Sequence, residues 1–192
     1  MPLQSISYQN LSDEELMPEM AEGSSGAFDE LYKRYGQKLF SYFFRMLWKN
    51  KELAEDCTQE LFIKLIKNAQ GFEHEKSLST WLYSIAHNMC KNEYRREEVR
   101  NKHVAMNKGS EKTTEAKNLD LRRFKEAVHD CMSELDEEKK SLFVLRFQEQ
   151  LSVPEISGIM NIPEGTVKSR LFYLLKDMKE KLKHFETVPV YP

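Results

Sequence analysis

Apolar residues recur every three or four positions along most of the chain, which is the pattern of amphipathic α-helices. The clearest example runs from Leu151 to Leu182 and divides into two helices. Its second half carries one long apolar face, formed by Val167, Leu171, Leu174, Leu175, Met178 and Leu182. The pattern predicts an all-α protein.

The start of this stretch has the signals of a helix-turn-helix. Ser152 with Glu155 three residues later is a capping box, in which the two side chains satisfy free backbone N–H groups. Asn161 tolerates the left-handed conformation at a helix end, and Pro163 opens the next helix. These signals predict two helices joined by a tight turn.

The apolar spacing in the N-terminal half predicts further amphipathic helices. Ser12 and Glu15 form another capping box, and a long helix rich in aromatic residues follows Gly26. Two more helices are predicted over 51–69 and 80–96. The apolar period is lost after that, so residues 98–118 are predicted to be a flexible linker. The chain is therefore expected to hold two small helical domains, residues 1–97 and 119–192, the second containing the helix-turn-helix.

Composition limits the classes of protein that fit. The 192 residues are 40% hydrophobic and 31% charged, with few Gly and Pro, which is typical of a helical, folded chain. The net charge is only −2, so any basic surface for nucleic acid must be local. Cys57, Cys90 and Cys131 are odd in number and widely spaced, so neither a disulfide framework nor a metal site is expected.

Other absences in the sequence narrow the function. No apolar run approaches the ~20 residues that span a membrane, and the N-terminus does not resemble a signal peptide. We therefore expect a cytoplasmic protein without membrane insertion. The chain shows neither a Gly-rich phosphate loop nor a nucleophile motif, so neither an enzyme nor a cofactor is predicted.

Polar residues gather on one side of three predicted helices. Asp56, Gln59 and Glu60 are neighbours on the helix over 51–69, where they form either a solvated face or a docking patch for a basic protein. The helix over 80–96 has a donor-rich side that suits single-stranded nucleic acid, although its arginines also suit a helix C-terminus. Basic and hydroxyl residues begin the last helix, where they fit either DNA contact or a solvated face: Thr166, Lys168, Ser169 and Arg170.

Three passages, taken together, resemble a known family. AEDCTQELFIKL (54–65), LSTWLYSIAHNMCKNEYRR (78–96) and LSVPEISGIMNIPEGTVKSRL (151–171) occur in this order and at a characteristic spacing. The chain is similar to the extracytoplasmic-function (ECF) group of sigma-70-type RNA polymerase sigma factors. The resemblance implies a promoter-specific initiation factor that binds core RNA polymerase, the −10 and −35 promoter elements and an anti-sigma factor.

The resemblance also implies roles for individual residues. The contacts with core polymerase would be Asp56, Gln59, Glu60 and Phe62. The contacts with single-stranded −10 DNA would be Phe72, Lys76, Ser79, His87, Asn88, Lys91, Asn92, Arg95 and Arg96. The contacts with the −35 duplex would be Glu164, Gly165, Thr166, Lys168, Ser169, Arg170 and Tyr173.

The chain departs from the family pattern at two places. Asn161 stands where the family usually has Gly, and residues 172–175 (Phe-Tyr-Leu-Leu) stand where Arg-rich residues are typical. The second departure favours fewer phosphate contacts or burial of Phe172 against a partner. Two alternatives stay open. One is a dimeric helix-turn-helix repressor or activator, and the other is a sigma mimic that titrates an anti-sigma factor.

Overall fold

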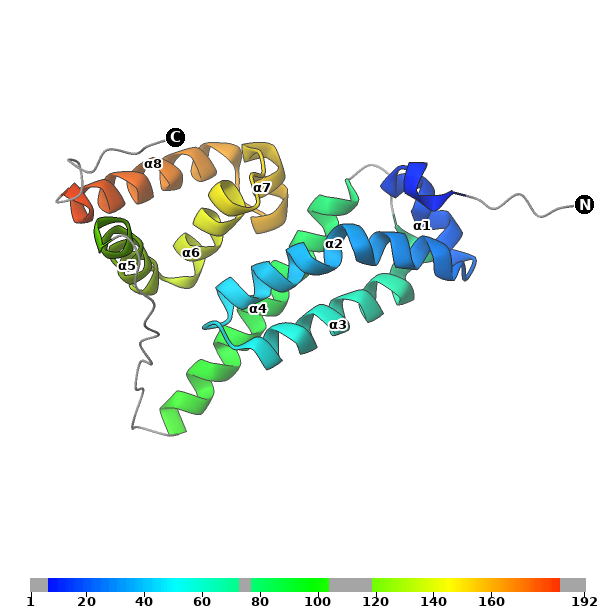
Figure 1. Ribbon diagram of the computed structural model, residues 1–192, viewed down its shortest axis with the longest axis horizontal. Coiled ribbons are helices and arrows are strands. Elements are labelled where there is room, and N and C mark those ends of the chain that lie inside the picture. Colours follow the sequence, from blue (N-terminus) through cyan, green and yellow to red (C-terminus); the bar gives the residue numbers. More distant parts are fainter. Residues whose placement is uncertain (1–6, 73–76, 104–118, 184–192) are drawn as a thin grey trace, which may run out of the picture.

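The computed structural model describes residues 7–72, 77–103 and 119–183, and these residues form helices joined by short turns (Figure 1). The first domain contains η1 (Tyr8–Asn10), α1 (Asp13–Ala21), α2 (Ser25–Met46), α3 (Lys51–Asn68), η2 (Ala69–Gly71) and α4 (Leu78–His103). The second domain contains α5 (Leu119–Ser133), α6 (Glu137–Phe143), the π-helical turn η3 (Val144–Gln148), α7 (Val153–Met160) and α8 (Glu164–Lys181). The predicted all-α, two-domain fold is confirmed.

The first domain is built around α2, whose apolar stripe packs against α1, α3 and α4. Its core consists of large aliphatic and aromatic side chains with no exposed surface, among them Leu31, Leu39, Phe43, Leu61, Leu65 and Leu82. Each such side chain stabilises the fold by about 1.5–3 kcal/mol when fully buried. This core fixes the outward faces of α3 and α4.

The second domain contains the predicted helix-turn-helix. Ser152 and Glu155 form the expected capping box at the start of α7. Asn161 ends that helix in the left-handed conformation, with φ of 54°. The apolar faces of α7 and α8 meet in a small core that includes Ile156, Ile159, Val167, Leu171 and Leu174.

Helix α4 is longer than the apolar period predicted. The sequence pattern placed its end near Arg96, whereas the helix continues to His103. An ion pair between residues three positions apart supports the polar extension, in which Nη1 of Arg100 lies 3.3 Å from Oε2 of Glu97. Charge pairing can therefore extend a helix where hydrophobic spacing gives no signal.

The two domains touch each other. Helix α7 packs against α4, and α6 contacts both α2 and α4. Figure 1 shows the second domain beside one end of the α2–α4 bundle, with α3 on the opposite edge of that bundle. The sequence pattern did not predict this contact. Residues 104–118, between the domains, lie outside the described residues.

Candidate nucleic-acid and protein interfaces

Helix α3 presents an acidic and amide face to solvent. Asp56, Gln59 and Glu60 are all exposed and lie within one turn of each other, as the spacing predicted. Glu60 pairs with Lys64 at 2.8 Å, and Ile63 is exposed on the same helix. The face combines negative charge with an apolar neighbour, which suits a basic protein surface better than it suits DNA.

Phe62 must be corrected as a polymerase contact. Its side chain is only 3% exposed, and its ring lies 6.0 Å from Phe28 and 4.8 Å from Tyr32, measured between ring centroids. The ring fills the space between α2 and α3. It therefore supports the acidic face from behind and does not present itself to a partner.

The donor-rich side of α4 is partly exposed to solvent and partly covered by the second domain. One part remains exposed to solvent: Asn88, Asn92, Arg95 and Arg96. Lys91 is half-buried, close to the second domain. The exposed part keeps the amide and guanidinium donors that could hold a nucleic-acid backbone.

His87 must also be corrected, because it faces the second domain. It is 4% exposed, and its Nδ1 lies 2.9 Å from Oγ of Ser141, which in turn lies 3.3 Å from the hydroxyl of Tyr42. Burial, followed by the positive charge of Lys91, lowers the pKa of His87 to about 4, although Glu138 acts in the opposite direction. The imidazole is therefore neutral at physiological pH and belongs to the domain contact.

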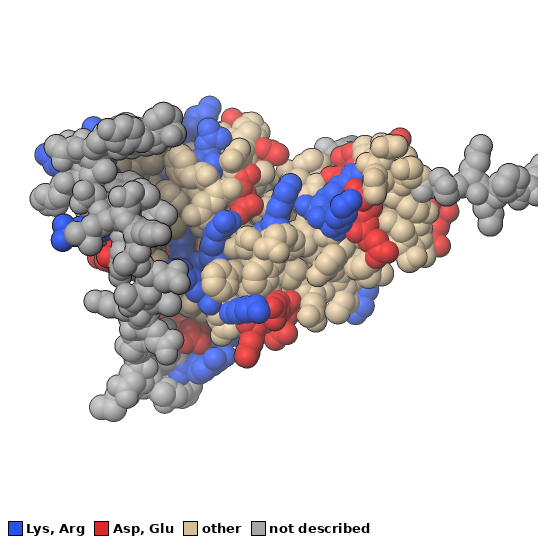
Figure 2. Space-filling model, in the orientation of Figure 1, with Lys and Arg blue, Asp and Glu red and all other residues tan. Residues whose placement is uncertain are grey.

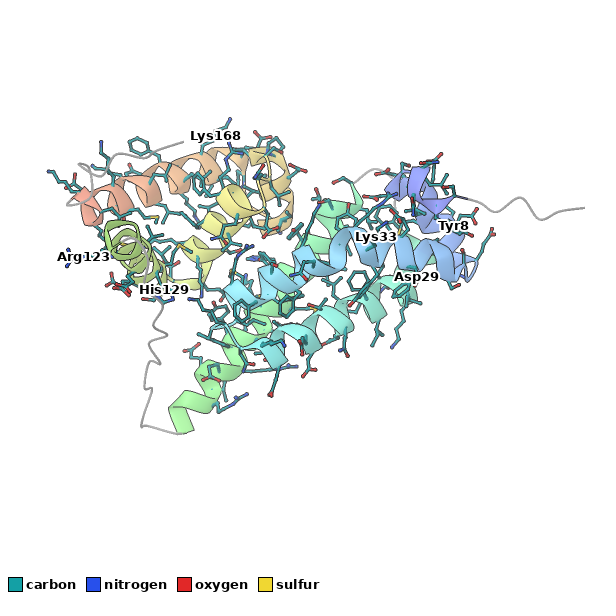
Figure 3. The ribbon with its side chains drawn as sticks, viewed as in Figure 1. Tyr8, Asp29, Lys33, Arg123, His129 and Lys168 are labelled. Carbon is teal, nitrogen blue, oxygen red and sulfur yellow. The ribbon has the colours of Figure 1, made fainter. Side chains whose placement is uncertain are left out.

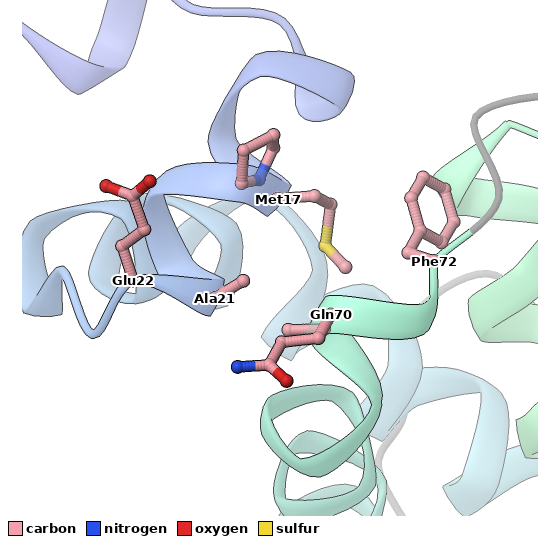
Figure 4. A pocket seen from close by; sticks show the side chains of 7 residues that line it. Met17, Ala21, Glu22, Gln70 and Phe72 are labelled. Carbon is pink, nitrogen blue, oxygen red and sulfur yellow. The ribbon is translucent and has the colours of Figure 1, made fainter.

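The segment before α4 forms a pocket. Phe72 packs edge-on against Trp81, with 5.8 Å between ring centroids. Its ring also lines a pocket of about 310 Å³ between α1 and η2, together with Met17, Ala21 and Gln70 (Figure 4). Lys76 lies outside the described residues.

Hydroxyl side chains mark the beginning of α4. Ser77 caps the helix, because its Oγ accepts a hydrogen bond from the backbone N–H of Thr80 at 3.2 Å. Ser79 is half-buried and lines a second pocket, which lies between the domains.

The first turns of α8 are accessible. Glu164, Gly165, Lys168 and Ser169 are exposed, and Thr166 is half-buried. Lys168 lies on the outer side of α8 (Figure 3), within 3.8 Å of Glu164. The free N–H groups at this end favour a phosphate, and the side chains reach where a base edge could lie.

Arg170 and Tyr173 on α8 differ from the exposed polar residues at the start of this helix. The Nη1 atom of Arg170 donates to Oε2 of Glu138 at 2.7 Å, so its charge is paired within the domain. Tyr173 is 61% exposed next to Phe172, which is 64% exposed. Phe172 is not buried by the described residues, and its burial against a partner stays a prediction.

Charge is mixed over the face of the molecule in Figure 2, where Lys and Arg side chains alternate with Asp and Glu. This agrees with the net charge of −2 and leaves only local basic surface for nucleic acid. Among the described residues, no helix is long and apolar enough to cross a membrane, and no cluster of metal-ligating side chains is found. All three cysteines are buried, and burial raises the pKa of Cys57 to about 11.

Sequence reasoning missed the residues that join the domains. Tyr42, Ser141 and Glu149 make the contact, yet each is unremarkable in the apolar pattern. Tyr42 belongs to an aromatic stripe that is typical of a hydrophobic core, and Glu149 lies in a polar turn. From the sequence alone, isolated polar residues such as Ser141 and Glu149 cannot be distinguished from polar residues that face solvent.

Comparison with known proteins adds the family. Residues 31–100 match the family described as Sigma-70 region 2, and residues 125–178 match Sigma-70, region 4. The ECF RNA polymerase sigma-E factor of Haemophilus influenzae is 31% identical over 91% of this chain and 97% of its own length. The chain belongs to the ECF sigma factors. It is thus an alternative sigma factor that directs the initiation of transcription, and this family does not consist of enzymes.

One further relative is similar in sequence to the sigma factor, and two solved structures share its fold. The ECF sigma factor SigW of Bacillus subtilis is 28% identical over 86% of this chain and 94% of its own. CnrH, solved in complex with the cytosolic domain of CnrY, shares the fold with a TM-score of 0.67 at 21% identity, over 90% of this chain and 97% of that chain. RpoE of Bartonella quintana, solved with the anti-sigma factor NepR, has a TM-score of 0.63 at 23% identity, over 81% and 96%.

Proposed function

We propose that the sigma factor divides promoter recognition among three helices. The acidic face of α3 binds core RNA polymerase, the exposed side of α4 holds the opened −10 strand, and the start of α8 binds the −35 duplex. The observation that carries this proposal is that the three polar faces are exposed on separate helices, each within a family passage. The polymerase performs all the bond-making chemistry.

The −10 strand would lie along α4. Asn88, Lys91, Asn92, Arg95 and Arg96 supply amide and cationic donors for phosphates and base edges along successive turns of the helix. Taking a base out of the stack costs a few kcal/mol, which a pocket for that base must offset. The pocket lined by Phe72 offers an aromatic wall and the amide of Gln70 for this purpose.

The −35 duplex would meet the first turns of α8. Arg170 is the strongest candidate for a base contact, because a guanidinium can donate two parallel hydrogen bonds to guanine. Its ion pair with Glu138 is partly exposed to solvent, and such pairs contribute only about 0–1 kcal/mol. DNA can therefore displace Glu138 at small cost.

An anti-sigma factor is the expected regulatory partner. CnrH and RpoE were both solved with a partner protein, and the partner of RpoE is an anti-sigma factor. In this chain, Phe172, Tyr173 and Leu175 expose a large apolar area on α8, which a partner could cover. Because RNA polymerase works in the cytoplasm, we place the sigma factor there as well.

Run-off transcription with purified core polymerase and a library of genomic promoters tests the proposal. We expect the wild-type chain to start RNA synthesis at a defined set of promoters. Arg170→Ala should lose protection of the −35 element, whereas Lys176→Ala, an exposed residue farther along α8, should not. A sigma mimic would yield no transcript, and a dimeric regulator would bind a palindromic operator without polymerase; either result refutes the proposal.

A further inference from the structure

We propose that the pocket between α1 and η2 selects the base that it takes from the −10 strand. It accepts a base with an exocyclic amino group, cytosine or adenine, and rejects thymine and guanine. Glu22 and Gln70 are the residues that distinguish these bases. The inference rests on the proposed function, which places opened DNA along α4, and it names the class of base that the same pocket binds.

The two elements that form the pocket are held in place by the core of the first domain. Helix α1 packs against both α2 and η2, and the side chain of Met17 is only 1% exposed. Glu22 ends α1, and Gly23 follows with φ of 93°, a conformation that Gly adopts readily. The turn at Gly23 therefore fixes the point at which Glu22 leaves the helix, beside η2.

The lining of the pocket has the chemistry that a nucleobase requires. Apolar side chains form most of the wall: Met17, Pro18, Ala21, Ala69 and Phe72. Two exposed polar side chains complete it, and they come from opposite sides, Glu22 from the end of α1 and Gln70 from η2 (Figure 4). Neither Lys nor Arg is among the described residues that line the pocket. It therefore suits an uncharged ring and offers nothing to a phosphate group.

The size of the pocket fits one base. Its volume of about 310 Å³ is at the lower end of the ~300–1,000 Å³ that is typical of ligand pockets. In the described part of the chain, the side chains of Glu22 and Gln70 form neither an ion pair nor a hydrogen bond with another residue. Both polar groups are therefore available to a ligand.

The pocket lies at the start of the helix that carries the proposed DNA donors. Phe72, in its wall, contacts Trp81 of α4, with 5.8 Å between ring centroids. The exposed residue Asn88 lies two turns beyond Trp81, or about 10 Å along the helix axis. A strand that follows α4 can span this length with about three nucleotides, at ~3.4 Å for each. The next base along the strand can then enter the pocket.

The two polar groups distinguish amino bases from keto bases. A carboxylate accepts hydrogen bonds and cannot donate them, whereas an amide does both. Cytosine and adenine carry an amino group that can donate to Glu22, beside a ring nitrogen that can accept from the amide of Gln70. Thymine and guanine place a keto oxygen where the amino group would be. Two acceptors would then face each other, and the base would lose its water without gaining a replacement.

An acidic residue beside a DNA strand is itself informative. The charge of Glu22 repels the phosphate groups of the strand, so it lowers the affinity for every sequence alike. A direct hydrogen bond to a base edge, in contrast, changes the affinity for one class of base only. Glu22 therefore contributes to the selection of a base and not to general DNA binding.

Fork-junction DNA with an unpaired −10 strand tests the selection. The full chain is assembled with core polymerase, and an abasic site is placed at each unpaired position in turn. The captured base is at the position where the abasic site weakens binding most. Cytosine or adenine at this position should bind at least tenfold more tightly than thymine or guanine. Equal binding of all four bases would overturn the proposal, as would a strand in which no abasic site weakens binding.

Variants of Glu22 connect the preference to this residue. In Glu22→Gln, the amide can accept from an amino group or donate to a keto group, so the preference for cytosine over thymine should fall below about threefold. Glu14→Gln is the matched control, because it removes the same charge from an exposed position on α1 outside the pocket. Its preference should equal that of the wild type. A preference that survives in Glu22→Gln would contradict the proposal.

Removal of the amino group tests the contact itself. Pyrimidin-2-one is cytosine without its amino group, and its use at the captured position should weaken binding of the wild type at least tenfold. The same replacement should have little effect in Glu22→Ala, because the acceptor is already absent. Equal losses in the two proteins would show that the amino group and Glu22 do not interact.

Free nucleosides test the pocket without a promoter. The methyl resonance of Met17, assigned by its loss in Met17→Leu, reports binding in the full chain labelled with carbon-13 at the methionine methyl groups. Deoxycytidine should shift this resonance at a concentration at least tenfold lower than thymidine does. Equal shifts with both nucleosides, or no shift with either, would overturn the proposal.

The experiments also separate this inference from the proposed function. If the wild-type chain starts no transcription, the assignment of promoter contacts fails, while the nucleoside titration still decides whether the pocket prefers an amino base. If the chain transcribes but neither the fork DNA nor the nucleosides reveal a preference, the selection by Glu22 and Gln70 fails and the promoter contacts stand.

Discussion

Helices α3 and α4 pack side by side in the first domain, and each carries a polar side opposite an apolar one, yet these polar sides have different surroundings. On α3, the side with Asp56, Gln59 and Glu60 is wholly exposed. On α4, part of the polar side is exposed, whereas His87 is buried under Ser141 of the second domain.

This difference shows that a polar side of a helix can serve either a partner molecule or another part of the same chain. The polar side of α3 is exposed and can meet a partner directly. The polar side of α4 is divided between the contact with the second domain and the exposed donors that we assign to DNA. Variants that change one of these sides and leave the other unaffected test whether the two sides act independently.

The largest expected effect is a pH dependence that originates at His87 on α4. The pKa of folded His87 is lowered to about 4, below its ordinary 6.5, so the contact between the two domains needs a neutral imidazole. The contact is therefore fully stable above pH 6.5 and weakens as the pH falls toward 4, by about tenfold per unit and ~3 kcal/mol in all. Spin labels on cysteines that replace the exposed residues Lys33 and Glu180 report the distance between the domains, which should lengthen from pH 7.5 to pH 4. His87→Gln should flatten this response, and an unchanged slope in that variant would exclude His87 as its source.

The next effect concerns α3. Reversing both acidic charges, with Asp56→Lys and Glu60→Lys, should weaken binding to core polymerase by about 100-fold, because like charges would then face each other. Equilibrium titration with labelled core measures the affinity, and the distance between the spin labels on the two domains should not change. Asp29→Lys is the matched control, since Asp29 is an exposed acid on α2 (Figure 3). Wild-type affinity in the double variant would contradict the assignment of α3.

A smaller effect is expected on the exposed part of α4. Asn88→Ala combined with Arg95→Ala should reduce promoter opening by roughly tenfold, because two donors to the opened strand are lost. Permanganate reactivity of unpaired thymines measures the opening. Arg100→Ala, on the same helix and exposed, serves as the control. Normal opening in the double variant would place the −10 strand elsewhere.

The smallest effect is the loss of one hydroxyl group. Tyr83→Phe removes the hydrogen bond to Glu149 and should weaken the contact between the two domains by about 1 kcal/mol, or roughly fivefold. The fraction of chains with the domains in contact, taken from the label distances, reports this change. Tyr32→Phe, on the exposed side of α2, should leave that fraction unchanged. If both variants behave alike, the hydroxyl of Tyr83 does not contribute to the contact.

Local chemistry explains which parts of the structure could be predicted from the sequence. The capping box at Ser152 and Glu155 and the left-handed Asn161 follow from short-range backbone requirements, so the helix-turn-helix was predictable. The exposed set on α3 followed from helical spacing. The positions of Phe62 and His87 depend on side chains that are distant in sequence, which helical periodicity does not register.

The π-helical turn η3, Val144–Gln148, has a consequence for how the chain tolerates changes in length. A π turn holds one residue more than an α turn, and here it lies between Ser141 and Glu149. Deleting one residue within it would rotate everything downstream by about 100° and shift it by about 1.5 Å. Glu149 and α7 would then point away from the first domain while Ser141 stayed in place. The number of residues in η3 therefore sets the rotation of the helices that follow it. This number matters more than which amino acids occupy the turn.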